Sequence, residues 1–334
     1  MKNNNVWPAF AVMAAAAIVL LGILAVWQPD DQHQKSKLRL AINLWPGYEL
    51  LYVAKVQNFF EQEGLDVDLI QFSTLDDARR SFERGQVDAI AATLVDIVQI
   101  YRDRGEMPKI LLAADYSDGG DVIVSMKHRA PDVKSLKGKT VGVEQMFGRF
   151  VLDRALNLHG LSLRDVRLVE TSVMGASRML QRGDVDAIVT YVPYVIETHK
   201  VAGTKTIFTT RETPGQIFDV IATRTEHLQR IPDLQGKMTR VWSRSFEFLR
   251  KSPREAMEIM ARREGISVDE FKGALEGVRL IPAEQQAAML APAGPLVASL
   301  EALLDVPGWS DPAELKAAAA QDFLATRTSI GLER

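Results

Sequence analysis

The sequence predicts an α/β protein of two lobes, in which the second lobe is inserted in the first. The main observation is an internal repeat, because the stretch 84–90 (RGQVDAI) recurs at 182–188 as RGDVDAI. Each copy has the order helix, glycine, strand, helix, glycine and strand, in which a glycine ends each helix and an apolar run enters a sheet. A chain of 334 residues is long enough to form two such lobes.

Each copy also begins with a strand, a short loop and a helix. In the first copy the strand 38–44 leads through the loop 45–48 into an amphipathic helix at 50–60. In the second copy the strand 140–143 leads through the loop 144–148 into a helix. Ligands gather at the carboxyl ends of parallel strands, where helix N-termini also lie. The two loops are therefore predicted to carry binding residues.

A shorter sequence similarity relates DVIV at 121–124 to DVIA at 219–222, and these two segments lie on either side of the second copy. We interpret these segments as strands that cross between the lobes, although Val-Ile runs are common in strands and chance similarity is the alternative. Beyond residue 224, Pro, Gly and capping residues mark a helical C-terminal region. The predicted boundaries are lobe 1 at 38–121, lobe 2 at 122–218, hinge crossings near 121–125 and 217–222, and a return to lobe 1 with C-terminal helices at 219–334.

The N-terminus carries an apolar run without formal charge at 6–27, preceded by a lysine. Such a run spans a bilayer as a helix, and the positive flank stays in the cytoplasm. We therefore expect 1–28 to be an N-terminal transmembrane helix that anchors the chain to the inner membrane. A tether at 29–37 and a periplasmic remainder follow. A cleaved signal peptide is the alternative, although Ala25, with Ile23 two places before it, is a poor cleavage site.

Composition argues against several kinds of chemistry. The net charge of −3 gives no sign of a nucleic-acid partner, and the absence of cysteine removes disulfides, thiolate nucleophiles and a lipid-bearing cysteine. The five histidines lie far apart, and no Walker, Rossmann or nucleophile-elbow pattern occurs. We therefore expect no metal site, no cofactor and no catalytic residue, so that the chain is not an enzyme.

The sequence resembles the periplasmic solute-binding proteins for nitrate, taurine and aliphatic sulfonates, whose relatives bind thiamine pyrimidine precursors. The resemblance covers roughly residues 38–280 and implies a two-lobed periplasmic-binding-protein fold, type II-like, that closes on a small molecule and presents it to an ABC permease. It rests on the order and spacing of the segments 51–64, 85–90, 117–121, 136–143 and 183–193.

Mapped onto this chain, the resemblance implies a set of ligand-binding residues at strand ends and in the hinge. They are Trp45, Tyr48, Thr74, Thr93, Tyr116, Asp121, Gln145, Phe147, Gly148, Arg149 and Tyr191. We add Asp219, because it begins the second predicted crossing strand as Asp121 begins the first. Trp45 and Tyr48 could stack on a flat ligand, with packing of their loop as the alternative. Arg149, near a helix start, could pair with an anion, with a solvated surface position as the alternative.

The charge of the ligand is a separate question. At 144–148 the chain has EQMFG where family members have a Gly-Ser-Thr-type loop that holds the oxygens of an anion. Acids at the predicted strand ends, Asp121 and Asp219 among them, outnumber Arg149. If they face the cleft, a cationic or amine-bearing heterocycle fits better than an anion, because like charges repel in a desolvated site. Acids are also the usual turn and cap residues, which is the structural alternative.

Three functions are compatible with these features. The leading hypothesis is an extracytoplasmic receptor of an ABC importer, which binds a small molecule between two lobes. The second is a membrane-tethered sensor that docks on a membrane signalling protein. An enzyme on the same fold, like the pyrimidine-forming relatives, is the third, and the missing cysteines and the export signal count against it.

Overall fold

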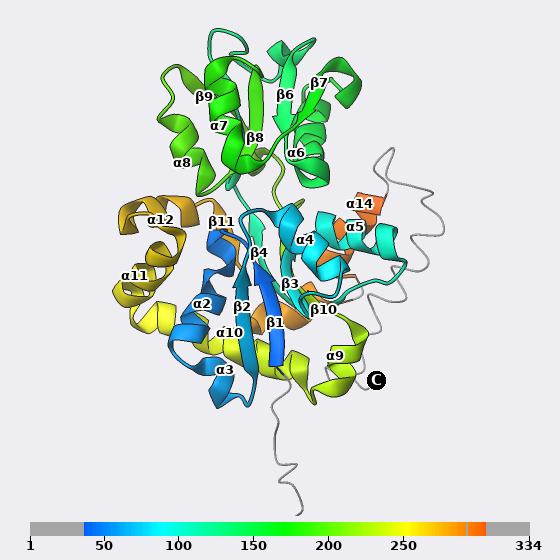
Figure 1. Cartoon of the computed structure of the whole chain (residues 1–334), viewed down its shortest axis with the longest axis vertical. Coiled ribbons are helices and arrows are strands. Elements are labelled where there is room, and N and C mark those ends of the chain that lie inside the picture. The colour runs from blue at the N-terminus through cyan, green and yellow to red at the C-terminus, as the bar shows by residue number, and fades with distance from the viewer. Residues whose placement is uncertain (1–36, 292, 305–334) are drawn as a thin grey trace, which may run out of the picture. The chain divides into compact units, whose positions relative to one another are not determined.

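The computed structural model describes residues 37–291 and 293–304, whose strands form two sheets (Figure 1). This arrangement confirms the predicted α/β class. Among these residues, no helix has both the length and the apolarity needed to cross a bilayer. The predicted anchor at 6–27 and the predicted tether lie outside the described residues, except for Lys37, which begins the first strand rather than ending a tether.

The first sheet has six strands in the order β11-β4-β10-β3-β1-β2. Strand β1 pairs in parallel with β2 and β3, whereas β10 pairs antiparallel with β3 and β4. We call this sheet and its helices lobe 1. The strands are β1 (Lys37–Ile42), β2 (Asp66–Gln71), β3 (Ala89–Thr93), β4 (Lys109–Ser117), β10 (Phe218–Thr223) and β11 (Val278–Leu280).

The second sheet has five strands in the order β7-β6-β8-β5-β9 and, with its helices, forms lobe 2. Strand β6 pairs in parallel with β7 and β8, and β5 pairs antiparallel with β8 and β9. The same pattern relates β2, β1, β3, β10 and β4, so the internal repeat corresponds to two sheets of like topology. The strands are β5 (Asp121–Met126), β6 (Thr140–Val143), β7 (Arg167–Glu170), β8 (Ala187–Tyr191) and β9 (Thr204–Thr209).

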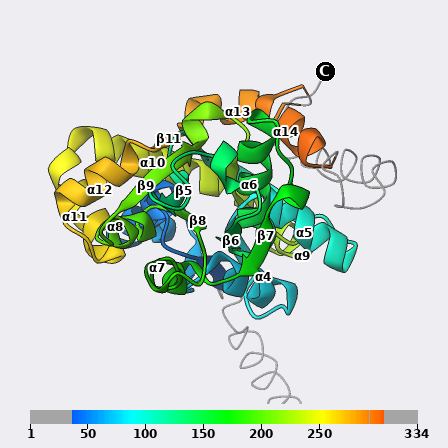
Figure 2. The same cartoon turned by 90° about the horizontal axis from the view of Figure 1, so that it is seen from above.

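The helices of lobe 1 come from both ends of the described chain, and α11 and α12 lie side by side in both views (Figures 1 and 2). The expected helix at 50–60 is divided, because Asn58 adopts a left-handed φ of 57°. The helices are η1 (Pro46–Tyr48), α2 (Glu49–Val56), α3 (Phe59–Gln62), α4 (Leu75–Glu83), α5 (Leu94–Arg104), α9 (Thr225–Arg230), α10 (Leu234–Lys251), α11 (Pro253–Glu264), α12 (Val268–Leu275), η5 (Ala283–Gln285), α13 (Gln286–Met289) and α14 (Pro295–Leu304).

Lobe 2 contains one clear departure from prediction, because the expected loop at 144–148 is helical. Helix α6 begins at Gln145, directly after the extended residue Glu144. A Cβ on Gly148 would lie 3.2 Å from Cβ of Val143, so this glycine permits close packing of α6 on β6 and does not mark a loop. The helices are η2 (Lys134–Leu136), α6 (Gln145–Leu158), η3 (Leu163–Asp165), α7 (Val173–Arg182), α8 (Tyr194–His199) and η4 (Thr210–Glu212).

The chain passes from the first sheet to the second at 118–120 and returns at 210–217. Hydrogen bonds tie these crossings to each other and to the region before β11. The backbone N–H of Gly119 donates to Oγ1 of Thr210 at 2.8 Å, and that of Asp118 donates to the carbonyl of Gly277 at 2.9 Å. Asp118 also pairs with Arg279 at 2.7 Å. The segments 121–124 and 219–222, which we expected to cross between the lobes, are instead strands β5 and β10, each within a single sheet, and the crossings lie just before them.

Candidate functional site

A small cavity lies between lobe 1 and lobe 2. Strands β1 and β3 run in parallel, so their carboxyl ends meet at the edge of the first sheet that faces this cavity. Lobe 2 contributes the start of β5, the first turn of α6 and the end of β8. The lining residues are Asn43, Trp45, Tyr48, Leu75, Thr93 and Asp219 of lobe 1, and Asp121, Phe147 and Tyr191 of lobe 2.

The structure brings together those predicted residues that lie at strand ends or in the first helical turn after a strand. They are Trp45, Tyr48, Thr93, Asp121, Phe147, Tyr191 and Asp219. Sequence reasoning missed Asn43 and Leu75. The expected first strand ran to residue 44, which hid Asn43 inside it, whereas β1 ends at Ile42 and leaves Asn43 at the cavity. Leu75 follows the predicted residue Thr74 directly and begins α4.

Two predicted residues of lobe 1 do not line this cavity. Oγ1 of Thr74 caps helix α4, because it accepts a hydrogen bond from the backbone N–H of Asp77 at 3.1 Å. The ring of Tyr116 packs against that of Phe218, with 5.6 Å between centroids. Both side chains therefore interact with other residues of lobe 1 and do not face the cavity.

Three predicted residues of lobe 2 also lie away from the cavity, because they belong to helix α6 and point to other sides of that helix. Oε1 of Gln145 accepts a hydrogen bond from Arg79 of lobe 1 at 3.4 Å, in a second small cavity. Gly148 packs on β6, as described above. Arg149 pairs with Glu170 at 3.6 Å, with its side chain 40% exposed. The expectation that Arg149 faces the ligand does not agree with this solvated position.

Every hydrogen-bond donor that the cavity's aromatic and hydroxyl side chains carry is already used inside the protein. Nε1 of Trp45 donates to Asp115 at 3.1 Å, and the hydroxyl of Tyr48 donates to Asp219. Oγ1 of Thr93 donates to Asp96 at 2.5 Å, and the hydroxyl of Tyr191 donates to Glu144 at 3.2 Å. In each case the acceptor is a carboxylate. These four pairs fix the aromatic rings and the acids against each other.

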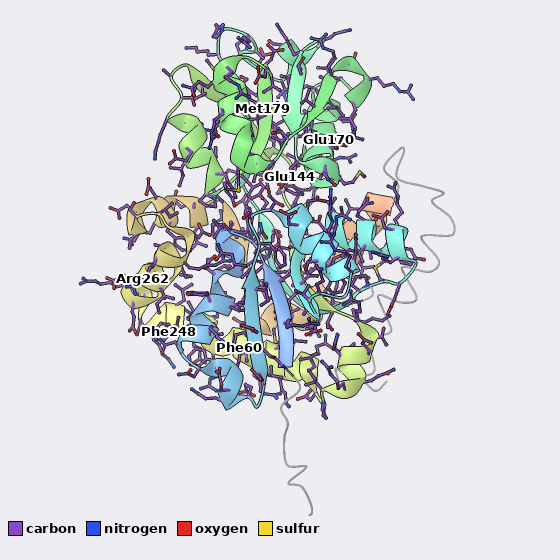
Figure 3. All side chains as sticks on the ribbon, viewed as in Figure 1. Phe60, Glu144, Glu170, Met179, Phe248 and Arg262 are labelled. Carbon is purple, nitrogen blue, oxygen red and sulfur yellow. The ribbon has the colours of Figure 1, made fainter. Side chains whose placement is uncertain are left out.

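Among the residues that line the cavity, the buried side-chain polar atoms without a hydrogen-bond partner are acceptors. Oδ1 of Asn43 and Oδ2 of Asp121 are both buried, belong to lining residues and have no donor. Behind them, Oδ2 of Asp115 and Oε1 of Glu144 are also unpartnered. Figure 3 shows Glu144 at the end of lobe 2 that is nearest lobe 1. The interior between the lobes is therefore rich in acceptors.

The acids around the cavity are held in an environment that disfavours their charge. No Lys, Arg or His is among the residues that line the cavity. Burial raises the pKa of Asp121 to about 7 and that of Glu144 to about 8. Burial, and then the nearby charge of Asp121, raise the pKa of Asp115 to about 8. The pKa of Asp219 is raised well above its ordinary value by burial and by the charge of Asp115.

Glu144 provides a test of this environment through pH. Its pKa is about 8 in the folded state and near 4.5 in the unfolded state, so between these values the folded protein binds more protons. Stability is then highest at low pH and falls as pH rises, by about 1.4 kcal/mol per pH unit for one such group. We expect urea unfolding between pH 5 and 8 to show a smaller fall for Glu144→Gln than for the wild type. The variant keeps an acceptor for Tyr191.

Glu197→Gln is the matched control, because it removes the same charge from a side chain that is 68% exposed. If Glu144→Gln and Glu197→Gln gave the same pH dependence as the wild type, the raised pKa of Glu144 would be wrong.

Comparison with known proteins places these residues in a family. The family model described as "NMT1/THI5 like" matches residues 45–256. The alkanesulfonate-binding protein SsuA of Xanthomonas axonopodis pv. citri, solved with bound MOPS, superposes with a TM-score of 0.68 at 14% identity, covering 86% of this chain and 98% of that one. The periplasmic nitrate-binding protein NrtA of Synechocystis PCC 6803 superposes with a TM-score of 0.64 at 12% identity, covering 90% of each chain.

A curated relative has a different kind of name. The 4-amino-5-hydroxymethyl-2-methylpyrimidine phosphate synthase of Aspergillus parasiticus is 26% identical over 142 residues, which is 42% of this chain and 41% of that protein. Two further relatives carry the same synthase name. The chain thus matches less than half the length of these relatives. Their enzymatic name contradicts the expectation that the chain is not an enzyme, which rested on the absence of recognised catalytic motifs and of cysteine.

Proposed function

Because the chain belongs to the NMT1/THI5-like family, we propose that it is an extracytoplasmic receptor that binds a small molecule between its two lobes and presents it to an ABC permease. The fold is that of ABC-type substrate-binding proteins such as SsuA and NrtA. Those likenesses support the fold, and the step from fold to transport is part of our proposal. A membrane anchor at 6–27 would keep such a receptor beside its permease on the periplasmic side.

The observation that carries this proposal is a cavity whose wall comes from both lobes. A ligand that contacts Trp45 and Asp219 on one side and Phe147 and Tyr191 on the other stabilises the closed arrangement over an open one. Contacts between the lobes surround the cavity. The rings of Trp45 and Tyr191 meet edge to face at 6.1 Å, and the hydroxyl of Tyr194 donates to the carbonyl of Ser73 at 3.0 Å.

The proposal is tested by a thermal-shift screen of the full chain against small molecules of each charge type. A ligand at 100 times its dissociation constant adds about 2.7 kcal/mol of stability. We expect Trp45→Ala to abolish most of the shift, because the indole forms part of the wall and orders Asp115. Trp45→Phe is a milder variant, in case Trp45→Ala does not fold. It keeps an aromatic ring but loses the hydrogen-bond donor to Asp115, so it should retain only part of the ligand-induced shift.

Phe248→Ala is the matched control, since it also removes an aromatic ring, one that packs on Phe59 away from the cavity (Figure 3). A ligand shift that survived in both Trp45 variants would place the binding site elsewhere.

The synthase names of the curated relatives favour a second candidate, formation of 4-amino-5-hydroxymethyl-2-methylpyrimidine phosphate. Buried acids such as Asp121 and Glu144 offer carboxyl groups that could exchange protons near neutral pH. Expression of the full chain in a cell that lacks its own synthase separates the candidates. Growth without supplied pyrimidine supports the synthase, whereas no growth under these conditions leaves the receptor proposal in place. The sensor alternative would instead require a signalling protein that binds the loaded chain.

A further inference from the structure

The cavity between the lobes has a one-sided hydrogen-bonding character. Its donors on Trp45, Tyr48, Thr93 and Tyr191 are all committed to internal carboxylates. Its uncommitted polar atoms include Oδ2 of Asp121, a residue only 2% exposed, and Oδ1 of Asn43, also 2% exposed. A buried acceptor without a donor is costly, so a ligand that binds here gains most by bringing donors.

We propose that the ligand is a small organic cation, in which an ammonium or amidinium N–H group meets Asp121 and Asn43 while an apolar or aromatic body lies among the rings. This inference rests on the proposed function as a two-lobed binding protein and names the class of ligand for that cavity. It concerns charge and hydrogen-bonding pattern, which the fold alone does not determine.

The aromatic rings of the cavity support a cation of this kind. Trp45 and Phe147 each lie 6.1 Å from Tyr191 between ring centroids, and both pairs meet at steep angles. The two pairs present ring faces and edges from both lobes around one space. A cation within about 6 Å of an aromatic face is attracted by the ring, more strongly when water is excluded. The flat or apolar part of the ligand would gain contact area from the same rings.

The acids of the cavity supply the charge complement. Asp121 and Asp219 line the cavity, Asp115 and Glu144 stand behind it, and no basic side chain is among the lining residues. Burial raises the pKa of each of these acids, as expected for carboxyls that lack a cationic partner. A bound cation would provide that partner and so favour the ionised carboxylate.

An anion meets the opposite situation at the same place. A sulfonate or nitrate offers acceptors only, and the uncommitted atoms of Asn43 and of ionised Asp121 are acceptors too. Arg149, the one cation expected near the ligand from sequence, is paired with Glu170 instead. The ligand that is named with SsuA, and the one in the name of NrtA, therefore do not carry over to this cavity.

The test uses compounds that differ only in the charged group. Benzylamine, benzyl alcohol and phenylmethanesulfonate form one set. 4-Amino-5-aminomethyl-2-methylpyrimidine and its 5-hydroxymethyl counterpart form a second set, chosen because the synthase names mention the latter. Calorimetry of the full chain should give tighter binding of the amine than of the alcohol in at least one set, by about 10-fold or more, and no binding of the sulfonate.

Asp121→Asn should weaken binding of that amine by about 10- to 100-fold and leave the alcohol within a few-fold, because it removes the charge but keeps the shape. Asp219→Asn, which retains an acceptor for Tyr48, is a second variant in case the first does not fold. Asp269→Asn is the control, with a side chain that is 96% exposed.

The outcomes separate the two levels of inference. Tighter binding of the alcohol or the sulfonate than of the amine overturns the cation proposal and leaves the receptor in place. Equal effects of Asp121→Asn on amine and alcohol also overturn it. If no compound of any charge binds, here or in the broader thermal-shift screen, the proposed function fails together with it.

Discussion

Arg263→Gln is expected to lower the free energy of unfolding by about 3 to 5 kcal/mol, because it leaves buried acids without their counter-charge. Arg263 donates to the carboxylate of Glu49 and, at 3.0 Å, to the carbonyl of Asn43. Its side chain is 3% exposed and that of Glu49 is fully buried. The neighbouring Glu264 is also buried, and neither of its carboxylate oxygens has a hydrogen-bond partner among the described residues.

The two acids make this loss depend on pH. Burial, opposed by Arg263, raises the pKa of Glu49 to about 7, and burial with the charge of Glu49 raises the pKa of Glu264 to about 9. When Arg263 is removed, the acids can avoid an uncompensated charge only by holding a proton. The deficit in stability should therefore be largest near pH 8 and become smaller towards pH 5.

Urea unfolding at pH 5 and pH 8 measures both effects. Arg254→Gln is the control, because it removes the same charge from a side chain that is 93% exposed and should leave stability almost unchanged. A loss below about 1 kcal/mol for Arg263→Gln, or one that is independent of pH, would falsify this account of the cluster.

Gly47→Ala is expected to disrupt the ligand cavity from inside. A Cβ at this position would lie 1.9 Å from Oδ2 of Asp115 and 2.6 Å from Nε1 of Trp45, which are the two groups that bond to each other at the cavity wall. Both side chains are buried, so they cannot move aside without displacing their neighbours. We expect a loss of about 1 to 3 kcal/mol in stability from overpacking. We also expect ligand affinity to fall by more than 10-fold, because Trp45 moves out of place.

The control for this variant is Gly273→Ala in helix α12, where an added Cβ would meet nothing within 4 Å. An alanine there should stabilise the helix by up to about 1 kcal/mol. Thermal melts and calorimetry of both variants with any ligand found in the screen measure the difference. Unchanged ligand affinity in a folded Gly47→Ala protein would show that the contact between Trp45 and Asp115 does not shape the site.

Local patterns in the sequence were sufficient to predict two α/β lobes with a like order of helices and strands. The repeat at 84–90 and 182–188 predicts two like sheets because apolar runs and helix-ending glycines act over a few residues. Strand ends such as Thr93 and Tyr191 could also be placed at the cavity, since parallel strands bring their carboxyl ends together. The choice of Thr93 and Tyr191 as binding residues also rested on the resemblance to a family of solute-binding proteins.

Two other features could not be predicted in this way. The phase of α6 depends on where the helix starts, and an error of a few residues there turned Arg149 from the cavity to the surface. The cluster of Glu49, Arg263 and Glu264 joins residues more than 200 positions apart, and no local pattern marks it. The uncommitted acceptors were equally hidden, because whether Asp121 has a donor depends on tertiary contacts.

The insertion of one sheet between β4 and β10 also has a consequence for synthesis on the ribosome. All strands of lobe 2 lie within 121–209, so this lobe is complete once that continuous segment has emerged. The sheet of lobe 1 is completed later in synthesis, because its inner strand β10 pairs with β3 and joins Asp219 to Thr93 across more than 120 residues of chain. Lobe 2 is therefore expected to fold first, while the edges of β3 and β4 remain unpaired and open to wrong partners until β10 arrives.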